Sequence, residues 1–374
     1  MKNNMQFINL SKQYQRNKLS INKAINECLE SSSFILGKEV SRLEDRLAEF
    51  TGTKFCLTVA NGTDALEISE RAMGITKDDN VILPSFTWVS TAETVKIIGS
   101  EIKFADINNQ TFNIEFSEIS NLIDEKTKLI IGVSIFGQTC DLARIKKLAE
   151  KNNIYFIEDA AQSFGAISNG SVSCSIADIS TTSFFPSKPL GGYGDGGAIF
   201  TNNEALYDKC KLLARHGQNS SKEFLIAGFN SRLDEIQAAI LNVKLDIFEQ
   251  EIELRQKVAQ MYRNFLSACP EIIVPFIDEG NKSVFAQYTI LLPHSSHPKK
   301  IQAYLKAKGI PSVIYYSPPV HLHPAYFNKM QPPLPISESI TKICLSLPFD
   351  PYLEESDVKK ISISVIEAFE NITE

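Results

Sequence analysis

A lysine held between two prolines is the residue of this sequence best suited to covalent chemistry. Lys188 stands in SFFPSKPLGGYGDGG, residues 183–197. Pro186 and Pro189 each fix the backbone φ, and the second proline biases the lysine away from helical geometry. Five of the seven residues from 191 to 197 are glycines, which let the backbone approach another group closely. Such a stiff turn suits an amine that forms a Schiff base and moves protons. The alternative is an ordinary glycine- and proline-rich turn in which the lysine has no chemical role.

A carboxylate and an aromatic ring follow two other apolar runs. Asp159 lies in YFIEDAAQSFGA, and a carboxylate at a buried strand end needs a positive partner, such as a protonated heteroaromatic nitrogen. The alternative is that Asp159 caps a following helix together with Gln162, three residues on. Trp88, the only tryptophan, lies in LPSFTWVSTAE. Its ring either stacks on a flat ligand or belongs to the core.

The turn in TVANGTDALEIS, residues 58–69, provides a candidate anion site. Gly62 and Thr63 would present free backbone N–H groups at the start of a helix, where the helix dipole favours negative charge. An isolated Asn-Gly-Thr turn is weak evidence. A constrained lysine, an acid, an aromatic face and an anion site together match the requirements of pyridoxal 5′-phosphate (PLP).

Short apolar runs alternate with helical patterns from residue 56 onward and must position these groups. Each run is rich in β-formers and bounded by Gly, Asn, Asp or Pro, as buried strands of a mostly parallel sheet are. We therefore predict an α/β domain with helices on both faces, whose ligands collect at the carboxyl ends of the strands. The predicted strands are Cys56–Val59, Val81–Leu83, Ile102–Phe104, Leu129–Val133, Ile154–Ile157, Ile179–Phe184 and Ala198–Phe200.

The remaining segments are predicted to be mainly helical. Leu142–Lys151 has helical spacing, and the first fifty residues are helical and polar, with a loop at Ser31–Gly37. A long helix with an apolar stripe from Leu233 to Ile247 is predicted to be capped by Ser231 and Asp234. The character of the chain changes near residue 250, so we expect a large domain over 1–250 and a smaller α+β domain over 251–374. The second domain has a strand at Gln287–Leu292 and a closing helix at Glu355–Phe369.

Composition narrows the class of protein. With 374 residues, a net charge of −6 and a pI near 5.6, the chain is long enough for two domains and unsuited to nucleic acid or anionic membranes. The N-terminal segment has no apolar stretch typical of a secretion signal, and the longest apolar run is too short to span a bilayer. Seven dispersed cysteines indicate reduced thiols in the cytoplasm. Two histidine pairs, 294/297 and 321/323, are weak metal candidates, and we predict no metal site.

Taken together, these motifs resemble those of the DegT/DnrJ/EryC1/StrS family of sugar-nucleotide aminotransferases, which are fold-type I PLP enzymes. The resemblance covers essentially the whole chain and implies a mostly parallel seven-stranded sheet with a smaller C-terminal domain. No single motif is specific, but the set is. It comprises NGTDAL (61–66), PSFTWVST (84–91), FGQTCD (136–141), IEDAAQSFGA (157–166), SFFPSKPLGGYGDGGAIFTN (183–202) and GFNSRLDEIQAA (228–239).

The resemblance implies a role for each matching residue. Lys188 matches the Schiff-base lysine and Asp159 the partner of the ring nitrogen. The other cofactor contacts implied are Gly62, Thr63 and Ser183 at the phosphate, Trp88 on the ring and Gln162 near the phenolic oxygen. Asn230 matches a residue that reaches the phosphate from the other subunit, which implies a homodimer with shared active sites; the alternative is a simple turn residue. The implied substrate contacts are Arg232, Tyr316 and His321.

The resemblance also implies transamination from glutamate to a keto sugar nucleotide. Three departures from the commonest family pattern, Pro189, Ser134-Ile135-Phe136 and Tyr315-Tyr316, are expected near the sugar. They favour C3 of a UDP-linked 2-acetamido-3-keto hexose or hexuronate, for surface-polysaccharide biosynthesis. The alternatives are a C3 or C4 aminotransferase on a dTDP- or UDP-linked keto 6-deoxyhexose, a dehydratase that uses pyridoxamine phosphate, and a non-catalytic regulator. The presence of Lys188 argues against the dehydratase.

Overall fold

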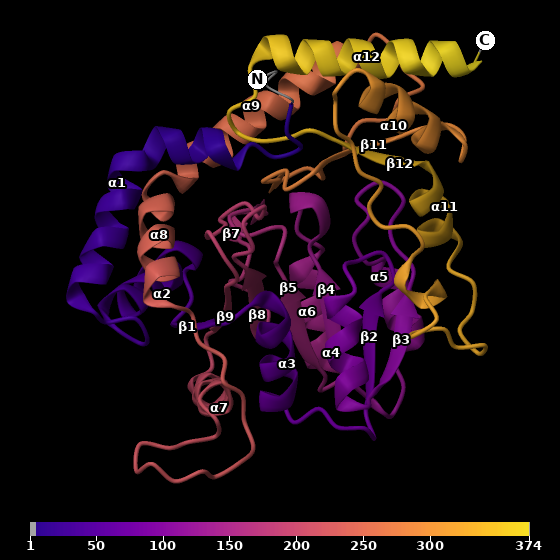
Figure 1. Cartoon of the computed structure of the whole chain (residues 1–374). Coiled ribbons are helices and arrows are strands. Elements are labelled where there is room, and N and C mark those ends of the chain that lie inside the picture. Colours follow the sequence, from indigo (N-terminus) through magenta and orange to yellow (C-terminus); the bar gives the residue numbers. More distant parts are fainter. Residues whose placement is uncertain (1–4, 374) are drawn as a thin grey trace.

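The structure, a computed structural model, describes residues 5–373 of the chain. The first four residues of the N-terminal segment, used above to argue against a secretion signal, lie outside this range. A seven-stranded sheet in the order β1-β9-β8-β5-β4-β2-β3 forms its centre (Figure 1). The strands are β1 (Phe55–Val59), β2 (Asn80–Pro84), β3 (Glu101–Ala105), β4 (Thr127–Val133), β5 (Tyr155–Asp159), β8 (Ile179–Ser183) and β9 (Gly197–Thr201).

All seven predicted strands are confirmed, with ends shifted by at most two residues. Four neighbouring pairs are parallel, from β8 through β5, β4 and β2 to β3. Strand β9 runs antiparallel to both of its neighbours, β1 and β8. The six other strands therefore share one direction, and their carboxyl ends lie along one edge of the sheet.

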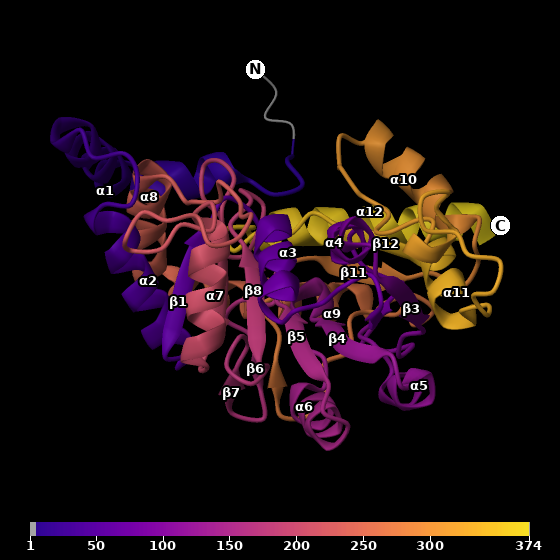
Figure 2. The ribbon, with the colours of Figure 1, turned by 90° about the horizontal axis from the view of Figure 1, so that it is seen from below.

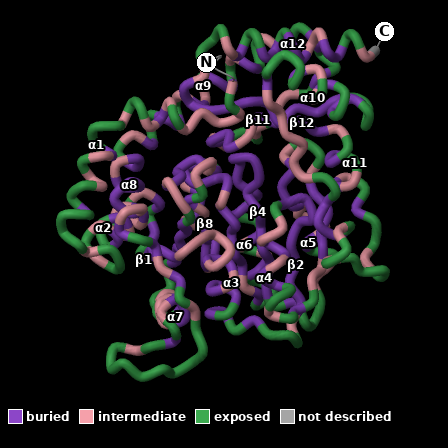
Figure 3. Tube along the Cα trace, viewed as in Figure 1, coloured by how far each residue is buried: buried purple, intermediate pink, exposed green. Residues whose placement is uncertain are grey.

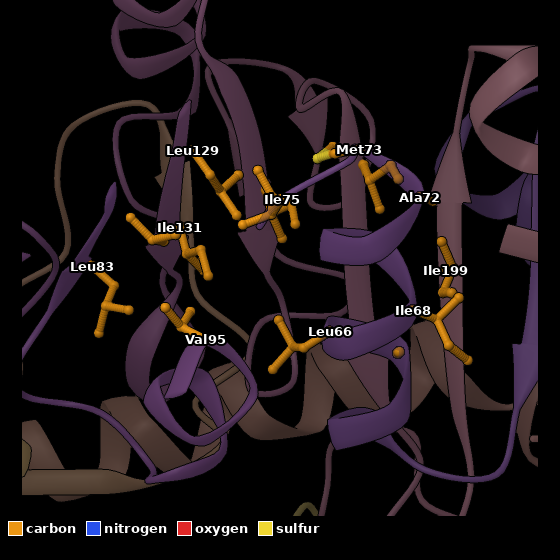
Figure 4. Packing of buried hydrophobic residues seen from close by; sticks show 14 of the residues in the cluster. Leu66, Ile68, Ala72, Met73, Ile75, Leu83, Val95, Leu129, Ile131 and Ile199 are labelled. Carbon is orange, nitrogen blue, oxygen red and sulfur yellow. The ribbon is translucent and has the colours of Figure 1, made fainter. Parts of the chain in front are cut away.

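Helices cover both faces of the sheet, as the α/β prediction requires. One face packs against α3 (Gly62–Ala72), α4 (Ser90–Ile98) and α7 (Glu204–Ala214). Figure 4 shows the α3 and α4 side chains on this face beside Ile131 and Ile199 of the strands. The opposite face packs against α2 (Lys38–Thr51), α5 (Phe116–Leu122), α6 (Leu142–Lys151) and α8 (Glu235–Asp246). In Figure 2, α5 and α6 lie on the side of the sheet away from α4.

The chain beyond α8 builds a second hydrophobic core. Helix α9 (Phe248–Leu266) contributes its first turns to the sheet core and its later turns to this second core. A division at residue 250 falls inside its first turn, so the domain boundary stays a prediction. The other elements are β11 (Tyr288–Leu291), β12 (Cys344–Leu347), α10 (His297–Ala307), α11 (Pro335–Ile343) and α12 (Glu355–Thr373).

The smaller elements complete the fold. Helix α1 (Leu10–Ser31) packs against α8, so the N-terminal helices flank the large domain as expected. A three-stranded sheet joins β6 (Ile167–Ser168), β7 (Ser171–Val172) and β10 (Asn281–Lys282). Two 3₁₀ turns, η1 (Ile135–Gly137) and η2 (Val320–Leu322), lie in loops. All seven cysteines are free and buried. Within residues 5–373 no helix combines the length and apolar character that a membrane crossing needs.

The predicted cap of the helix after residue 230 is wrong. Helix α8 begins at Glu235, and the Asp234 side chain makes no capping hydrogen bond. Ser231 lies outside the helix, and its Oγ accepts a hydrogen bond from the Ala60 amide at 3.1 Å. Its hydroxyl is used to hold the turn after β1. The predicted apolar stripe also extends beyond both ends of the helix, since Leu233 precedes its first turn and Ile247 follows its last turn.

A buried acid between α3 and α4 generates a test of stability. Glu70 is fully buried, and one of its carboxyl oxygens accepts a hydrogen bond from the Thr94 hydroxyl at 2.7 Å. Its other carboxyl oxygen has no hydrogen-bond partner among residues 5–373. Burial, which penalises the charged form, raises the pKa of Glu70 to about 8. In the unfolded chain this group ionises with a pKa near 4.3.

We expect Glu70→Gln to stabilise the protein increasingly as pH rises. Because the folded form of the wild type retains a proton that the unfolded form releases, its free energy of unfolding falls between about pH 5 and pH 8. The glutamine variant escapes this loss, so its advantage should grow by a few kcal/mol and level off above pH 8. Urea unfolding at pH 5, 7 and 9 measures it. Exposed Glu30→Gln is the control, and an advantage independent of pH would contradict the assignment.

Candidate active site

The predicted site residues gather at the carboxyl edge of the sheet. Asp159 is the last residue of β5, and Ser183 is the last residue of the neighbouring β8. Gly62 follows β1, and Trp88 lies in the loop between β2 and α4. Strand β9 begins at this edge, where Gly197 is paired with both Val59 and Ser183. The topology therefore brings segments from across the first two hundred residues to one place.

The lysine is carried by a hairpin that closes on itself between β8 and β9. The amide of Phe184 donates to the carbonyl of Gly196 at 2.8 Å, and the amide of Gly192 donates back to Phe184 at 2.7 Å. At the tip, the Lys188 amide donates to the Phe185 carbonyl at 2.8 Å. A side chain at Gly191 would lie 2.5 Å from the Pro186 carbonyl oxygen, so only glycine permits this closure. The turn is rigid as well as constrained by its prolines.

Asp159 is buried and Lys188 is half-buried, and the two lie close enough for each charge to influence the pKa of the other. The carboxylate accepts hydrogen bonds from the Thr91 hydroxyl at 2.8 Å and from the Ala161 amide at 3.2 Å. Burial raises the pKa of Asp159, against these bonds and the nearby Lys188. Burial also lowers the pKa of Lys188, and the Asp159 charge opposes that shift. The helix-cap alternative is wrong because residues 161–165 form turns and the element that follows Asp159 is strand β6.

The start of α3 leaves two amides free to bind an anion. Asn61 caps the helix by accepting from the Asp64 amide at 2.8 Å. The N–H groups of Gly62 and Thr63 have no acceptor within the described residues. A side chain at Gly62 would place its Cβ 2.9 Å from Ser183 Cβ, so the turn packs directly on the end of β8. These free amides and the Ser183 hydroxyl form a polar cradle.

Trp88 is not a core residue, because its side chain is 56% exposed. Its ring lies 5.9 Å from that of Tyr316, which in turn is stacked 6.4 Å from Phe136. Gln162 fixes the Tyr316 ring, since its amide Nε2 donates to the hydroxyl at 2.7 Å. The Gln162 Oε1 accepts from the Phe136 amide at 2.8 Å. The rings of Trp88, Tyr316 and Phe136 therefore form one aromatic face, although the loops that carry Trp88 and Tyr316 are far apart in the sequence.

His321 occupies a different setting from the one expected of a substrate contact. It is buried, and its Nδ1 lies 2.6 Å from the Ser85 hydroxyl. Its Nε2 lies 3.4 Å from a Glu338 carboxylate oxygen. Burial lowers the pKa of His321, while Glu338 opposes the change. With both ring nitrogens engaged, this histidine fastens the segment around η2 to the loop that carries Trp88.

The remaining expected substrate-side residues are dispersed. Asn230 is exposed and pairs with Arg215 at the base of a loop that projects beyond α7 (Figure 1). Arg232 lies two residues further on. Ser134 is fully buried and donates to Glu158 at 3.0 Å, so its side chain does not face an open site. Ser134 is therefore not placed to contact a sugar, whereas Phe136 of the same departure lies beside Tyr316 in the aromatic face.

Sequence reasoning missed two contributors to this site. The Thr91 hydroxyl donates a hydrogen bond to Asp159, and the Ser85 hydroxyl lies beside His321 Nδ1. Phe136, which was expected near the sugar, stacks on Tyr316. Thr91 and Ser85 both lie in the quoted segment around Trp88, but their partners are distant in sequence. The only feature of the sequence that could have indicated the role of Thr91 is its position in the first turn of a helix that follows a strand. Among residues 5–373, no group of three or more His, Cys, Asp or Glu side chains could hold a metal ion.

Comparisons with known proteins agree with this geometry. A model of the DegT/DnrJ/EryC1/StrS aminotransferase family matches residues 15–366. UDP-2-acetamido-2-deoxy-3-oxo-D-glucuronate aminotransferase of Pseudomonas aeruginosa is 45% identical over 357 residues, covering 96% of this chain and 98% of the relative.

Two solved structures share the fold. A DegT DnrJ EryC1 StrS aminotransferase from Brucella abortus superposes with a TM-score of 0.93 at 39% identity, covering 97% of this chain and 99% of that one. NtdA from Bacillus subtilis, with bound cofactor PMP, superposes with a TM-score of 0.87 at 27% identity, covering 95% and 82%.

We expect Asp159→Asn to lower the pKa of Lys188 further. The substitution removes the negative charge that favours the ammonium, while burial of the lysine is unchanged. Trinitrobenzenesulfonate reacts only with the neutral amine. In the cofactor-free protein, the pH midpoint for labelling of the peptide that contains Lys188 should therefore fall in the variant. Exposed Lys151, followed in the same digest, is the control. An unchanged or higher midpoint for Lys188 would mean that the two groups are not coupled.

Proposed function

On the premise that this chain belongs to the DegT/DnrJ/EryC1/StrS aminotransferase family, we propose that it transfers the amino group of glutamate to a keto sugar nucleotide with PLP as cofactor. The carrying observation is the convergence of the Lys188 hairpin, the buried Asp159 carboxylate and the free amides of Gly62 and Thr63 at one sheet edge. This arrangement meets the needs of a flat, phosphorylated aldehyde cofactor.

The residues at the edge fit each part of PLP. The two unpartnered amides and the Ser183 hydroxyl would hold the phosphate at the positive end of the α3 dipole. Asp159 would hold a proton on the ring nitrogen, and the positive ring would offset part of the penalty of burying this carboxylate. Trp88 would cover the ring face, and Gln162 would lie near its phenolic oxygen. When bound, PLP supplies the electron sink that stabilises negative charge at the substrate carbon and carries the amino group.

Lys188 is proposed to form the covalent link to the cofactor and to move the proton of the reaction. Burial lowers its pKa, so a larger fraction of the amine is neutral near pH 7 than in an exposed lysine. A neutral amine can take the proton from the α-carbon of glutamate. The closed hairpin restricts where this amine can lie, which favours proton transfer at one atom over competing positions.

The amino acceptor is proposed to be a UDP-linked 2-acetamido-3-keto hexuronate or hexose. Support comes from the relative that is 45% identical, whose name gives a UDP-linked 3-oxo-glucuronate substrate. In this proposal Arg232 contacts the anionic sugar or nucleotide, and Tyr316 lines the sugar side of the aromatic face. Amination at C4, or of a 6-deoxyhexose, is the alternative that product analysis distinguishes. Substrates of this kind and the seven free cysteines favour a cytoplasmic enzyme.

A homodimer with shared active sites is also proposed. Residues 220–228 of the loop between α7 and α8 are all exposed, and the loop projects from the body (Figure 3). It carries Phe224, Leu225 and Ile226, whose side chains are 70%, 59% and 44% exposed. Consecutive exposed apolar side chains of this size are costly in water and typical of a contact surface. Asn230 lies at the end of this loop, from which it would reach the phosphate site of the other subunit.

We expect Lys188→Ala to abolish amination. The variant lacks both the covalent link and the proton-transfer amine, so kcat should fall by at least about 10³-fold while the fold is retained. The assay incubates enzyme and glutamate with a panel of UDP- and dTDP-linked 3-keto and 4-keto sugars, and identifies the aminated carbon by NMR. Exposed Lys151→Ala is the control. Near wild-type turnover by Lys188→Ala would refute the proposal, and amination at C4 would correct the acceptor.

Subunit mixing tests the shared site. Lys188→Ala and a double variant, Asn230→Asp with Arg232→Glu, should each be nearly inactive alone. If Asn230 acts across the dimer, a mixed dimer has one site with both defects and one intact site. Activity should then rise to about a quarter to a half of wild type, depending on how fully the subunits exchange. Differently tagged subunits verify the exchange. Verified exchange without recovered activity would mean that each site belongs to one chain.

A further inference from the structure

Two side chains of α8 hold the return arm of the hairpin that carries Lys188. Gln237 Oε1 accepts a hydrogen bond from the Tyr193 amide at 2.8 Å. Two turns further along α8, the Lys244 ammonium donates to the Gly191 carbonyl oxygen. The two contacts grip the backbone on either side of Gly192, one as acceptor and one as donor.

The glycines of the return arm make room for these contacts. A Cβ at Gly192 would lie 2.9 Å from Gln237 Oε1, and one at Gly194 would lie 2.9 Å from Gln237 Nε2. The amide group of this side chain therefore lies beside both glycines, and a larger residue at either position would displace it. Gly192 and Gly194 of this run are thus explained by close packing rather than flexibility, because they leave room for the Gln237 side chain of α8 beside the main chain.

Lys244 is an unusual residue to find at this place. It is only 1% exposed, although burial of a lysine costs free energy unless the ammonium finds partners. Its partners are the Gly191 carbonyl and the ring of Tyr193, whose centroid lies 5.1 Å from the ammonium. Burial lowers the pKa of Lys244 to about 8, while nearby Glu251 opposes the shift. An apolar residue would fill the same space without this cost, so the ammonium serves a specific contact.

The hairpin transmits these contacts to the lysine. Gly192, which lies between the two gripped residues, donates to Phe184 at 2.7 Å, and Lys188 donates to Phe185 at 2.8 Å. Only Pro189 and Leu190 separate Lys188 from the contacted backbone at Gly191, and the proline fixes φ on that path. A shift of the return arm would therefore shift the Lys188 amine.

We propose that Gln237 and Lys244 are positioning residues that fix the approach of the Lys188 amine. This inference rests on the proposed function of Lys188 but names residues that the family resemblance did not assign. They act on the main chain of residues 191–193 and touch neither substrate nor cofactor. Their effect should therefore fall on kcat, because misplacement of a reacting group by about 1 Å can cost about 10²-fold in rate.

Matched variants separate positioning from general support. Gln237→Met removes the acceptor for the Tyr193 amide at similar size, and Gln237→Glu keeps an acceptor oxygen. Lys244→Met removes the donor. Asn242→Ala is the control on the same helix, because its side chain bonds to Glu39 of α2 and not to the hairpin. We expect both Met variants to lose at least about 10-fold in kcat with KM changed less than about 3-fold, and Gln237→Glu to stay within about 3-fold of wild type.

Amide hydrogen exchange of the full chain without cofactor gives a second readout. The peptide that spans 189–197 should exchange at least about 10-fold faster in both Met variants, and at the wild-type rate in Gln237→Glu and Asn242→Ala. Unchanged exchange in the Met variants, or equal acceleration in Asn242→Ala, would overturn the proposal. If the wild type proved inactive with every sugar, the proposed function would fail, while the exchange experiment would still decide whether α8 holds the hairpin.

Discussion

The mutual stabilisation of the Lys188 ammonium and the Asp159 carboxylate is the constraint that the rest of the site satisfies. Burial favours the neutral form of both groups, and each charge opposes the shift of the other. Two adjacent parallel strands make the pairing possible, since β5 ends at the acid and β8 leads into the lysine hairpin. A parallel sheet with its carboxyl ends at one edge therefore determines where this chemistry can occur.

Strand β9 explains why one antiparallel strand interrupts this sheet. The lysine hairpin must return to the sheet directly after β8, and a short connection permits only an antiparallel neighbour. The return brings Gly197 against the turn after β1, where a Cβ would lie 2.5 Å from the Asn61 carbonyl oxygen. The same strand thus fixes the lysine relative to the free amides of α3. One reversal of direction joins the covalent and the anion-binding parts of the site.

The sequence was sufficient to predict local patterns, and insufficient to predict contacts between distant side chains. All seven strands were recognised because each is a short apolar run bounded by turn residues. The Ser231 cap failed because the same hydroxyl also suits the turn after β1, and only the fold selects between them. His321 was assigned to the substrate because the sequence does not show that its ring lies beside Ser85, which is more than two hundred residues away in the chain. Gln237 and Lys244 passed unnoticed for the same reason, since a polar residue on a helix is usually solvated.

Buried charged side chains of α8 and α9 connect the hairpin to the rest of the molecule. Glu251, near Lys244, accepts hydrogen bonds from Gln13 of α1 at 2.8 Å and from the Tyr352 hydroxyl in the C-terminal part. Arg255, one turn further on, donates to the Phe285 carbonyl at 3.1 Å. Buried ions are tolerated only where several elements supply their partners at once. The N-terminal helix and the C-terminal part therefore both supply partners to the buried charges of α9. The apolar side chains of α9 also pack into both hydrophobic cores, so this helix joins the two parts of the molecule by charge as well as by packing.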